Sequence, residues 1–375
     1  MRQDKSGREC PPCEGLPPLV SVRIHNYNYG RFLRQCFESV LAQTYPNFEI
    51  SFSDNASEDE SWKIALEYQR RHPDRVSIAR NRQNFGPDAN IVNCVFQSSG
   101  KYTVQMCSDD VMAPDFIETC VRTLEAHPDC AFAMVHRGII DGDGEPRTEP
   151  PFYDRSCIIP GHEQAAVYMM AAINPSISQV MYVSAREAAH RVDFSKVLAG
   201  RWYGARIMDF NLCCDYDVAY IDRPLLYHRL HGANDSHAAA SNLMEVIGPY
   251  LLHLQFAEIA RTRGMHGVLE NLDRSTEKLG QLCLRYSTRA LVEGFSEVAE
   301  RYFHLAQALS PRVAEEPAFA ALGKFWHADE DERQGILDAL KNSENLVERA
   351  ISYPPPAGSR SIGAQALSRN PGAEA

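Results

Sequence analysis

Short apolar runs alternate with longer amphipathic segments over the first third of the chain. The runs expected to form strands are 19–24, 48–53, 76–80, 102–107 and 130–136. The segments expected to form helices are 30–43, 60–72, 88–99 and 114–127. Strands separated by helices of this length are typical of βαβ units with a parallel sheet. The pattern therefore predicts the α/β fold class.

Polar residues follow three of these strands at the point where each strand ends. Asp109 and Asp110 follow the fourth strand, Asp54 follows the second, and HNYN (25–28) follows the first. Ligands of parallel α/β sheets bind beyond the carboxyl ends of the strands. Asp and Asn are also common in turns and at helix starts, but three such clusters at one edge of one sheet favour a site.

The pattern changes farther along the chain. A short helix is expected at 204–214, and two strands, 218–221 and 225–230, are expected to flank a turn at 222–224. From 243 to 349 the strand signals disappear and the periodicity is helical. We therefore expect a disordered tail (1–17), an α/β domain (18–242), a C-terminal all-helical domain (243–350) and a second disordered tail (351–375).

Composition and charge exclude some classes of protein. The chain has 38 basic and 49 acidic side chains and a net charge of −11, which argues against binding to nucleic acid. No apolar stretch is long enough to cross a bilayer, and the first residues lack the apolar core of a secretory signal. The 11 cysteines are then expected to be reduced thiols in a cytoplasmic protein. One CxxC pair, Cys10 and Cys13, is weak evidence for a metal site.

Three longer stretches resemble the signatures of the family 2 glycosyltransferases, in the order in which that family has them. They are residues 20–61, residues 84–116, which include SDDVMAPDF, and residues 207–236. The resemblance implies a GT-A fold, with a Rossmann-like, mostly parallel sheet flanked by helices. It also implies transfer of a sugar from a nucleotide-diphosphate donor to a hydroxyl, with inversion at the anomeric carbon.

The resemblance assigns several residues to the nucleotide-sugar donor. Asp54 matches the family's Asp that accepts a hydrogen bond from the nucleobase, a role that suits a carboxylate with no donors of its own. Asn26 and Tyr27 match the loop beside the base. Asn55 and Asn84 lie in the same matched stretches and are assigned to the donor as well.

The acidic pair and the last signature are assigned to the diphosphate. In the family, the residue matching Asp109 leans toward the ribose, and the residue matching Asp110 binds a divalent metal ion. Mg²⁺ or Mn²⁺ takes oxygen ligands and neutralises the charge that develops on the departing nucleoside diphosphate. Such a cation also offsets the repulsion between two adjacent carboxylates. Arg229 matches a phosphate-binding residue and His231 a residue that reaches the metal or the phosphates, with a core histidine as the alternative.

Transfer with inversion needs a base on the face opposite the leaving group. The resemblance assigns this role to Asp209, in the place of the Asp of a Glu-Asp pair that opens a helix. The spacing of Ile207 and Phe210 toward a core is expected to leave Asp209 facing the cleft. Asp215 and Asp217 are the alternative bases. The interpretation without a catalytic role is that Asp209 is an ordinary solvent-exposed Asp on a helix.

Other features leave the function partly open. His25, Cys107 and Met208 depart from the family pattern, which indicates a divergent subgroup. A catalytically silent GT-A domain that serves as a binding scaffold is the main alternative to an active enzyme, and a nucleotidyltransferase is a third. The donor sugar is open, and the acceptor is open between a saccharide, a lipid-linked saccharide and a peptide. Peripheral membrane association and a homo-oligomer formed through the helical domain also stay open.

Overall fold

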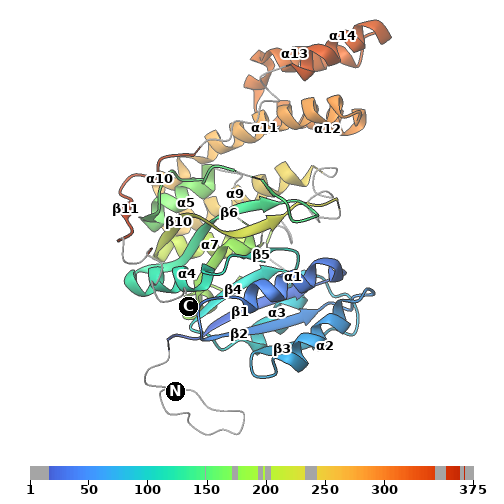
Figure 1. The fold of residues 1–375 in the computed structure, drawn as a ribbon. Coiled ribbons are helices and arrows are strands. Elements are labelled where there is room, and N and C mark those ends of the chain that lie inside the picture. The colour runs from blue at the N-terminus through green and yellow to red at the C-terminus, as the bar shows by residue number, and fades with distance from the viewer. Residues whose placement is uncertain are drawn as a thin grey trace.

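The computed structural model describes residues 17–147, 149–170, 176–192, 197–198, 204–232, 243–342, 352–363 and 367. Its centre is an 11-stranded sheet with helices on both faces, and further helices extend from one end of the molecule (Figure 1). The predicted α/β class with a C-terminal helical region is confirmed. The strand order along the sheet is β11-β8-β10-β6-β9-β4-β1-β2-β3.

The first half of the sheet is a set of parallel strands joined by helices. Its strands are β1 (Val20–Asn26), β2 (Phe48–Asp54), β3 (Val76–Arg80) and β4 (Tyr102–Cys107), and its helices are α1 (Gly30–Leu41), α2 (Ser61–Arg71) and α3 (Pro87–Gln97). β1 pairs in parallel with β2 and β4, and β2 pairs in parallel with β3. All four strands therefore end at one edge of the sheet.

The second half of the sheet is mixed. Its elements are β5 (Val111–Met112), α4 (Phe116–Ala126), β6 (Cys130–Ile140), β7 (Pro146–Arg147), β8 (Cys157–Ile159), α5 (Gly161–Met170), a 3₁₀ turn η1 (Ile177–Gln179), β9 (Val180–Val183), α6 (Ser184–Ala189), α7 (Gly204–Asp215) and β10 (Asp217–Arg229). β9 runs antiparallel to both β4 and β6, and β10 runs parallel to β6. The strands β6 and β10 thus point in the same direction as β4.

The predicted turn at 222–224 is wrong. Asp217–Arg229 is one long strand, and its register against β6 shifts between Ile221 and Pro224. Proline has no N–H to donate, and a β-bulge is one of the few places where a sheet tolerates it. The sequence signal for a turn therefore marks an irregularity inside the strand.

The two faces of the parallel half differ in polarity. On one face, α1 and α2 bury an aromatic cluster in which Phe37 stacks on Tyr68 and packs against Phe52 of β2. On the other face, α3 contacts the sheet through polar side chains. Asn90 accepts a 2.6 Å hydrogen bond from Ser53 of β2.

The helical region begins in contact with the sheet domain. Its elements are α9 (Met244–Thr262), α10 (His266–Leu269), α11 (Leu272–Val292), α12 (Ser296–Leu309), a 3₁₀ turn η3 (Pro311–Glu315), α13 (Pro317–Phe325) and α14 (Glu330–Lys341). Phe256 and Ala257 of α9 belong to the same apolar cluster as Phe210 of α7 and Val218 of β10. Residues of α11 to α14 form a separate cluster. Among the described helices, none combines the length and apolar character of a membrane span.

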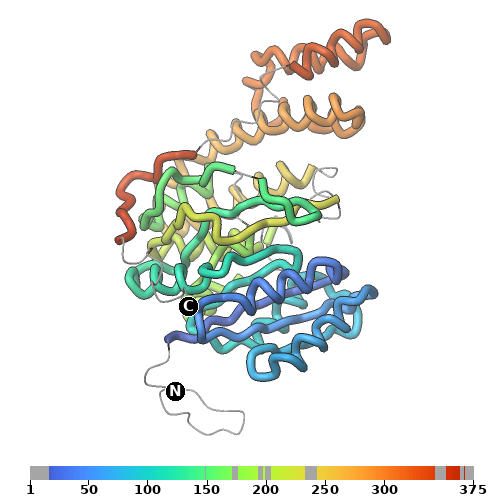
Figure 2. Tube along the Cα trace, viewed as in Figure 1, coloured from blue at the N-terminus to red at the C-terminus, as the bar shows by residue number. Residues whose placement is uncertain are grey.

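The end of the chain returns to the sheet. Residues 352–363 lie in the segment expected to be a tail, and Figure 2 shows them running back from the helical region. β11 (Arg360–Ser361) pairs antiparallel with β8, and Ile362 is buried in the main core. This part of the predicted disordered tail is therefore placed in the structure. Residues 1–16, with Cys10 and Cys13, lie outside the described residues.

Candidate active site

Sheet register brings the polar clusters together at the carboxyl edge. Asn26 at the end of β1 pairs with Asp54 of β2, and Asp54 pairs with Arg80 of β3. On the other side of β1, His25 pairs with Cys107 at the end of β4. The arrangement at one edge that the sequence predicts for these clusters is therefore present.

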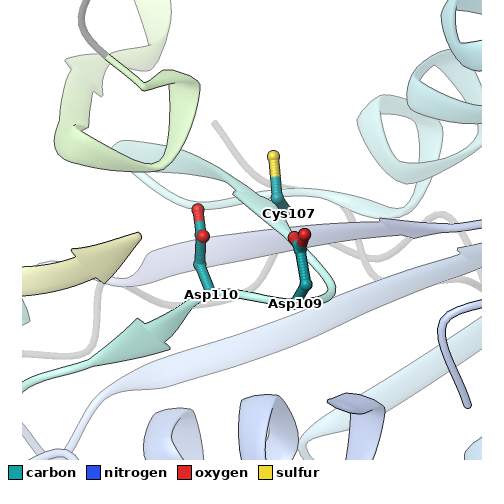
Figure 3. Close-up of side chains that lie close together, drawn as sticks. All are labelled: Cys107, Asp109 and Asp110. Atoms are coloured by element: carbon teal, nitrogen blue, oxygen red, sulfur yellow. The ribbon is translucent and has the colours of Figure 1, made fainter. Parts of the chain in front are cut away.

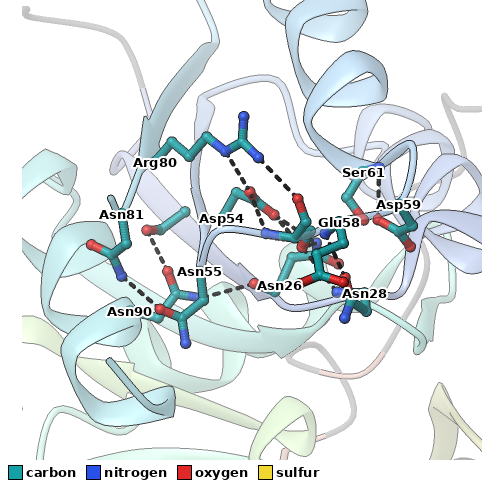
Figure 4. Close-up of polar contacts among 12 residues, drawn as sticks. Asn26, Asn28, Asp54, Asn55, Glu58, Asp59, Ser61, Arg80, Asn81 and Asn90 are labelled. Atoms are coloured by element: carbon teal, nitrogen blue, oxygen red, sulfur yellow. Dashed lines mark hydrogen bonds and ion pairs between the residues drawn. The ribbon is translucent and has the colours of Figure 1, made fainter. Parts of the chain in front are cut away.

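Asp54 is the centre of a buried hydrogen-bond network (Figure 4). Its carboxylate is 0% exposed and accepts hydrogen bonds from Asn26 at 3.1 Å and from the Ser57 hydroxyl at 2.5 Å. Arg80 Nε lies 3.2 Å from Asp54 Oδ2, and Arg80 Nη2 donates to the Ser57 carbonyl. Asp54 therefore holds the loop in place, and the half-exposed Arg80 is the charged group of this network that reaches the surface.

Asn55 links this loop to the one that precedes α3. Its side-chain nitrogen donates to Asn84 Oδ1 at 2.7 Å, and its Oδ1 accepts from Asn81 at 2.9 Å. Asn55 is 2% exposed, while Asn84 is exposed. Tyr27, which is 40% exposed, lies at the open side of the same edge. Tyr27 and Asn84 are thus better placed to meet a ligand than Asp54, Asn55 or Asn26.

Two loop residues of this edge have backbone conformations that are uncommon outside glycine. Asn28 has φ 57° and Ala56 has φ 61°. Asn tolerates the left-handed region, but a β-carbon makes it unfavourable for Ala by roughly 1 to 2 kcal/mol. The Asn28 side chain accepts from the Glu58 N–H at 2.8 Å, which ties the two loops to each other. Backbone strain of this kind is concentrated at functional sites.

Asp110 is fully enclosed by donors. Its Oδ2 accepts from Ser178 at 2.6 Å, and its Oδ1 lies 3.1 Å from His228 Nδ1 and accepts from the Arg229 N–H at 3.1 Å. The side chain is 0% exposed. Figure 3 shows the Asp110 side chain close to those of Asp109 and of Cys107, the last residue of β4.

Asp109 is the member of the acidic pair that contacts His231. Asp109 Oδ2 lies 3.2 Å from His231 Nε2, and Arg31 Nη2 lies 3.1 Å from His231 Nδ1. A guanidinium can only donate, so Nδ1 is the acceptor and Nε2 carries the proton that is donated to Asp109. Burial, with a further contribution from the charge of Asp110, raises the pKa of Asp109 to about 7. The two predicted metal-site residues, Asp110 and His231, therefore contact different partners.

Arg229 contacts, from inside the fold, the turn after β4 that carries Asp109 and Asp110. We call this turn the acidic turn. Its Nε donates to the Asp109 carbonyl oxygen at 2.9 Å, its Nη1 to the Asp141 carbonyl at 3.0 Å, and its Nη2 to Gln35 Oε1 at 2.6 Å. The residue is 1% exposed. Its donors are directed at the protein, so a phosphate could be bound only if these bonds were exchanged.

Asp209 does not face the open edge, and that expectation is wrong. It is 0% exposed, forms an ion pair with Arg206 one turn earlier in α7, and accepts from the Tyr182 hydroxyl at 2.7 Å. Burial raises its pKa, and Arg206 opposes the shift. The sequence argument fails because α7 is covered on several sides, so that positions off its apolar stripe are buried as well.

The two alternative bases lie at the opposite edge of the sheet. Asp217 begins β10, whereas Arg229 ends it. Asp217 pairs with Arg360 at 2.6 Å, and Asp215 pairs with His190 at 2.8 Å and with Arg263 at 2.9 Å. Because β10 points in the same direction as β4, its first residue is remote from the acidic turn along the strand.

The first part of this α/β unit has known relatives. Residues 21–179 match the model of glycosyl transferase family 2. EpsE of Bacillus subtilis is 34% identical to this chain over 110 residues, which are 29% of this chain and 40% of EpsE. The chain is also 28% identical over 236 residues to the uncharacterized glycosyltransferase alr2836 of Nostoc sp., covering 60% of this chain and 69% of that protein.

Solved structures show a more distant likeness. The crystal structure of S. aureus TarS 1–349 in complex with UDP-GlcNAc shares 15% sequence identity with this chain, with a TM-score of 0.49. The comparison covers 84% of this chain and 92% of that one.

The acidic turn after β4 fits a divalent cation. One ligand atom from each of Cys107, Asp109 and Asp110 lies within 4.8 Å of the others. Burial raises the pKa of Asp109, and repulsion from the buried Asp110 carboxylate adds to the shift. A cation would remove that conflict. Burial, Asp110 and Asp109 also raise the pKa of the Cys107 thiol, so the carboxylates are the better ligands for a hard cation.

Three residues of this candidate site are missed by the sequence analysis. Arg80 ends β3 at the same edge as Asp54, and the rule used for the other strand ends could have found it. His228 lies within the matched signature YHRLH, where only Arg229 and His231 were singled out. Ser178 comes from a segment whose pattern was mixed, and nothing in its local sequence points to Asp110.

Proposed function

We propose that this protein is an inverting glycosyltransferase that moves a sugar from a nucleotide-diphosphate donor to a hydroxyl acceptor, assisted by a divalent cation. The observation that carries the proposal is the acidic turn after β4, which lies beside the polar loops after β1 and β2 at one edge of the sheet. The matched part of the chain spans only 40% of EpsE, so the activity is inferred from the site and the family.

Asp109 and His231 are the residues that would hold the cation. Asp109 is 7% exposed and Asp110 is 0% exposed, with both Asp110 oxygens already accepting hydrogen bonds. This differs from the sequence prediction, which gave the cation to Asp110 and placed Asp109 toward the ribose. When bound, a Mg²⁺ or Mn²⁺ ion supplies positive charge against the diphosphate as the glycosidic bond breaks.

His231 must change its protonation to take part. Its Nε2 donates to Asp109 here, so a ligand role for Nε2 requires the proton to move to Nδ1. Nδ1 could then no longer accept from Arg31, and the exposed Arg31 side chain would be released from it. We infer that Arg31 then turns to the donor phosphates, since guanidinium groups bind phosphate oxygens in pairs.

The remaining roles follow from exposure. Tyr27, Arg80 and Asn84 are the groups that would meet the nucleotide, while Asp54, Asn55 and Asn26 hold the loops that present them. Asp110 and Arg229 position the acidic turn. Asp209 stays the predicted base, but it can act only if the Arg206 pair opens toward the acceptor.

The test is turnover of a donor panel. The full chain is incubated with UDP-, GDP- and dTDP-sugars, with Mn²⁺ or with EDTA, and the release of nucleoside diphosphate is measured. We expect cation-dependent release that is lost in Asp109→Asn and kept in Asp331→Asn, an exposed Asp of α14. Release of pyrophosphate instead would indicate a nucleotidyltransferase.

The silent-scaffold alternative gives a different result. A scaffold would be stabilised by a nucleotide sugar, by about 2.7 kcal/mol at 100 times Kd, without any product. Stabilisation with no turnover across the panel and a range of acceptors would therefore reject the enzymatic proposal.

A further inference from the structure

Helix α3 lies on the sheet with its polar side inward. Asn90 is 1% exposed, donates to the Asn26 carbonyl at 3.1 Å and accepts from Ser53. One turn later, Cys94 is fully buried against the Ile24 carbonyl. A helix that covers a sheet normally turns its apolar stripe to the sheet, so α3 is inverted.

The sheet beneath α3 explains this orientation. Residues of β1, β2 and β4 that point away from α1 and α2 are small or polar and buried: Ser21, Arg23, Ser51, Ser53, Thr103 and Gln105. Side chains of one strand alternate between its two faces, so one face is polar along three neighbouring strands. On this face Ser53 hydrogen-bonds to Asn90 and Asn93 of α3, so α3 turns its polar side to the sheet and its apolar residues away from the core.

The apolar residues of α3 are consequently on the surface. Phe96 is 83% exposed, which is the highest value among the exposed large apolar residues in the described part of the chain. Val92, one turn earlier, is 43% exposed, and Phe85, just before the helix, is 55% exposed. We name these three residues the α3 patch. Neighbouring exposed apolar residues on one helix face mark an interaction surface more often than isolated ones do.

The sheet edge beside the α3 patch is basic, whereas the whole protein is acidic. Its basic side chains come from α2, on the other face of the sheet from α3, and from β3 and the residues that flank it. The edge of the sheet from Ser61 to Gln97, comprising α2, β3 and α3, has six basic side chains, all of them exposed: Lys63, Arg70, Arg71, Arg75, Arg80 and Arg82. Of its three acidic residues, Glu67, Asp74 and Asp88, only Asp74 is exposed. The chain as a whole has a net charge of −11.

We propose that the α3 patch and the basic residues of this edge dock the protein on an anionic lipid surface. Aromatic and aliphatic side chains on one face of a helix enter the boundary between headgroups and acyl chains, and basic side chains nearby are attracted to anionic headgroups. A second copy of this chain fits the edge less well. A self-complementary contact there would bring two sets of exposed basic side chains together, which is unfavourable.

Docking would also orient the candidate active site. The α3 helix begins three residues after Asn84, whose side chain contacts Asn55. A membrane at the Phe85 end of the α3 patch would therefore lie near the same sheet edge as the site, while Phe96 lies toward the opposite edge, because α3 leads back to the start of β4. If the proposed function holds, the acceptor class that this favours is a lipid-linked saccharide. That step depends on the proposed function, whereas docking does not.

The experiment is co-sedimentation of the full chain with vesicles, without nucleotide or cation. We expect binding to phosphatidylcholine vesicles that contain phosphatidylglycerol, little binding to pure phosphatidylcholine, and release as salt rises above about 0.1 M. The double variant Val92→Ser/Phe96→Ser should bind at least about tenfold more weakly, because it loses the side chains that enter the lipid.

Matched variants separate docking through the α3 patch and its basic edge from a general effect of removing any exposed apolar or basic side chain. Phe295→Ser changes a phenylalanine that is 60% exposed before α12, and it should bind as the wild type does. Arg75→Gln/Arg82→Gln should lose binding to anionic vesicles, while Arg301→Gln in α12 should not. Far-UV circular dichroism and Tm show that all variants are folded.

Three outcomes would overturn the proposal. They are a wild type that does not bind anionic vesicles, equal loss of binding in Phe295→Ser and in the α3 double variant, or a wild-type dimer that Phe96→Ser converts to a monomer. The last result would assign the α3 patch to a second copy. Because no turnover is measured, failure here leaves the proposed activity unaffected, and failure of the donor panel leaves docking unaffected.

Discussion

Arg229 supports the backbone of Asp109 from inside the protein, with its Nε 2.9 Å from the Asp109 carbonyl oxygen. The same guanidinium reaches the Asp141 carbonyl and Gln35. The residue therefore ties the acidic turn to the turn after β6 and to helix α1. The buried guanidinium group of Arg229 thus holds together three segments that are far apart in the sequence.

Arg229→Lys should destabilise the protein by about 3 kcal/mol, because an ammonium group cannot reach all these acceptors and leaves buried carbonyl groups unpaired. Urea unfolding measures the change. Arg34→Lys is the matched control on α1, where an exposed ion pair with Glu67 is screened by solvent and should change the stability little. Unchanged stability with lost donor binding would instead support the phosphate role that the sequence predicts.

The edge where the site lies could be predicted from the sequence, but the contacts within it could not. Strand periods and the residues after each strand indicate where Asp54, Asp109 and Asp110 end up, since parallel strands share one carboxyl edge. Whether Asp109 or Asp110 is open depends on Ser178 and Arg229, which approach from other parts of the chain. The sequence around Asp109 and Asp110 does not indicate which distant residues will contact them.

Cation-free protein should lose stability as the pH rises from about 4 to about 7 because of Asp109. Its folded pKa of about 7 is above the ordinary value of 3.8, so the folded state binds more protons than the unfolded state in that window. The loss of unfolding free energy that comes from ionising Asp109 is absent below about pH 4 and complete above about pH 7. The difference in unfolding free energy between wild type and Asp109→Asn, measured in EDTA across this range, should show the slope.

A further measurement makes the pH prediction specific. Saturating Mn²⁺ should remove the slope, because a cation favours the ionised carboxylate. A wild-type curve parallel to that of Asp109→Asn would mean that Asp109 titrates normally.

Asp209→Asn distinguishes a structural from a catalytic carboxylate. The Arg206–Asp209 pair is enclosed, with the two side chains 3% and 0% exposed, so removing one charge should cost about 3 to 5 kcal/mol in unfolding free energy. The double variant Arg206→Leu/Asp209→Leu should recover most of that stability, because no charge stays unpaired. A base would behave differently, with normal stability, normal donor affinity and at least about a hundredfold slower transfer.

The orientations of α7 and α3 show a second limit of sequence patterns. Both helices have an apolar stripe, and the sequence predicts that the stripe faces the core. In α7 the opposite side is covered too, which buries Asp209, and in α3 the stripe is left in solvent because the sheet beneath it is polar. What a helix packs against depends on residues in other elements, so its own periodicity cannot settle which side is buried.

Phe256→Ala tests where the helical part of the chain begins. The sequence places a boundary at 243, and every residue that the family resemblance assigns to the donor lies before it. In the structure Phe256 of α9 stacks on Phe210 of α7, with ring centroids 4.2 Å apart and planes 9° from parallel, and both rings are buried. Truncation to Ala should cost about 3 to 5 kcal/mol, since it leaves a cavity in the core shared with β10.

Hydrogen exchange should then show lower protection in β6 and β10 as well as in α9, whereas Phe295→Ala, at an exposed position, should change neither. Loss of protection confined to 244–342 would mean that α9 unfolds with the other helices and that the predicted boundary is the right one. If the sheet loses protection, a chain that ends at 242 should fail to fold. Donor binding would then have to be tested with shortened chains that keep α9.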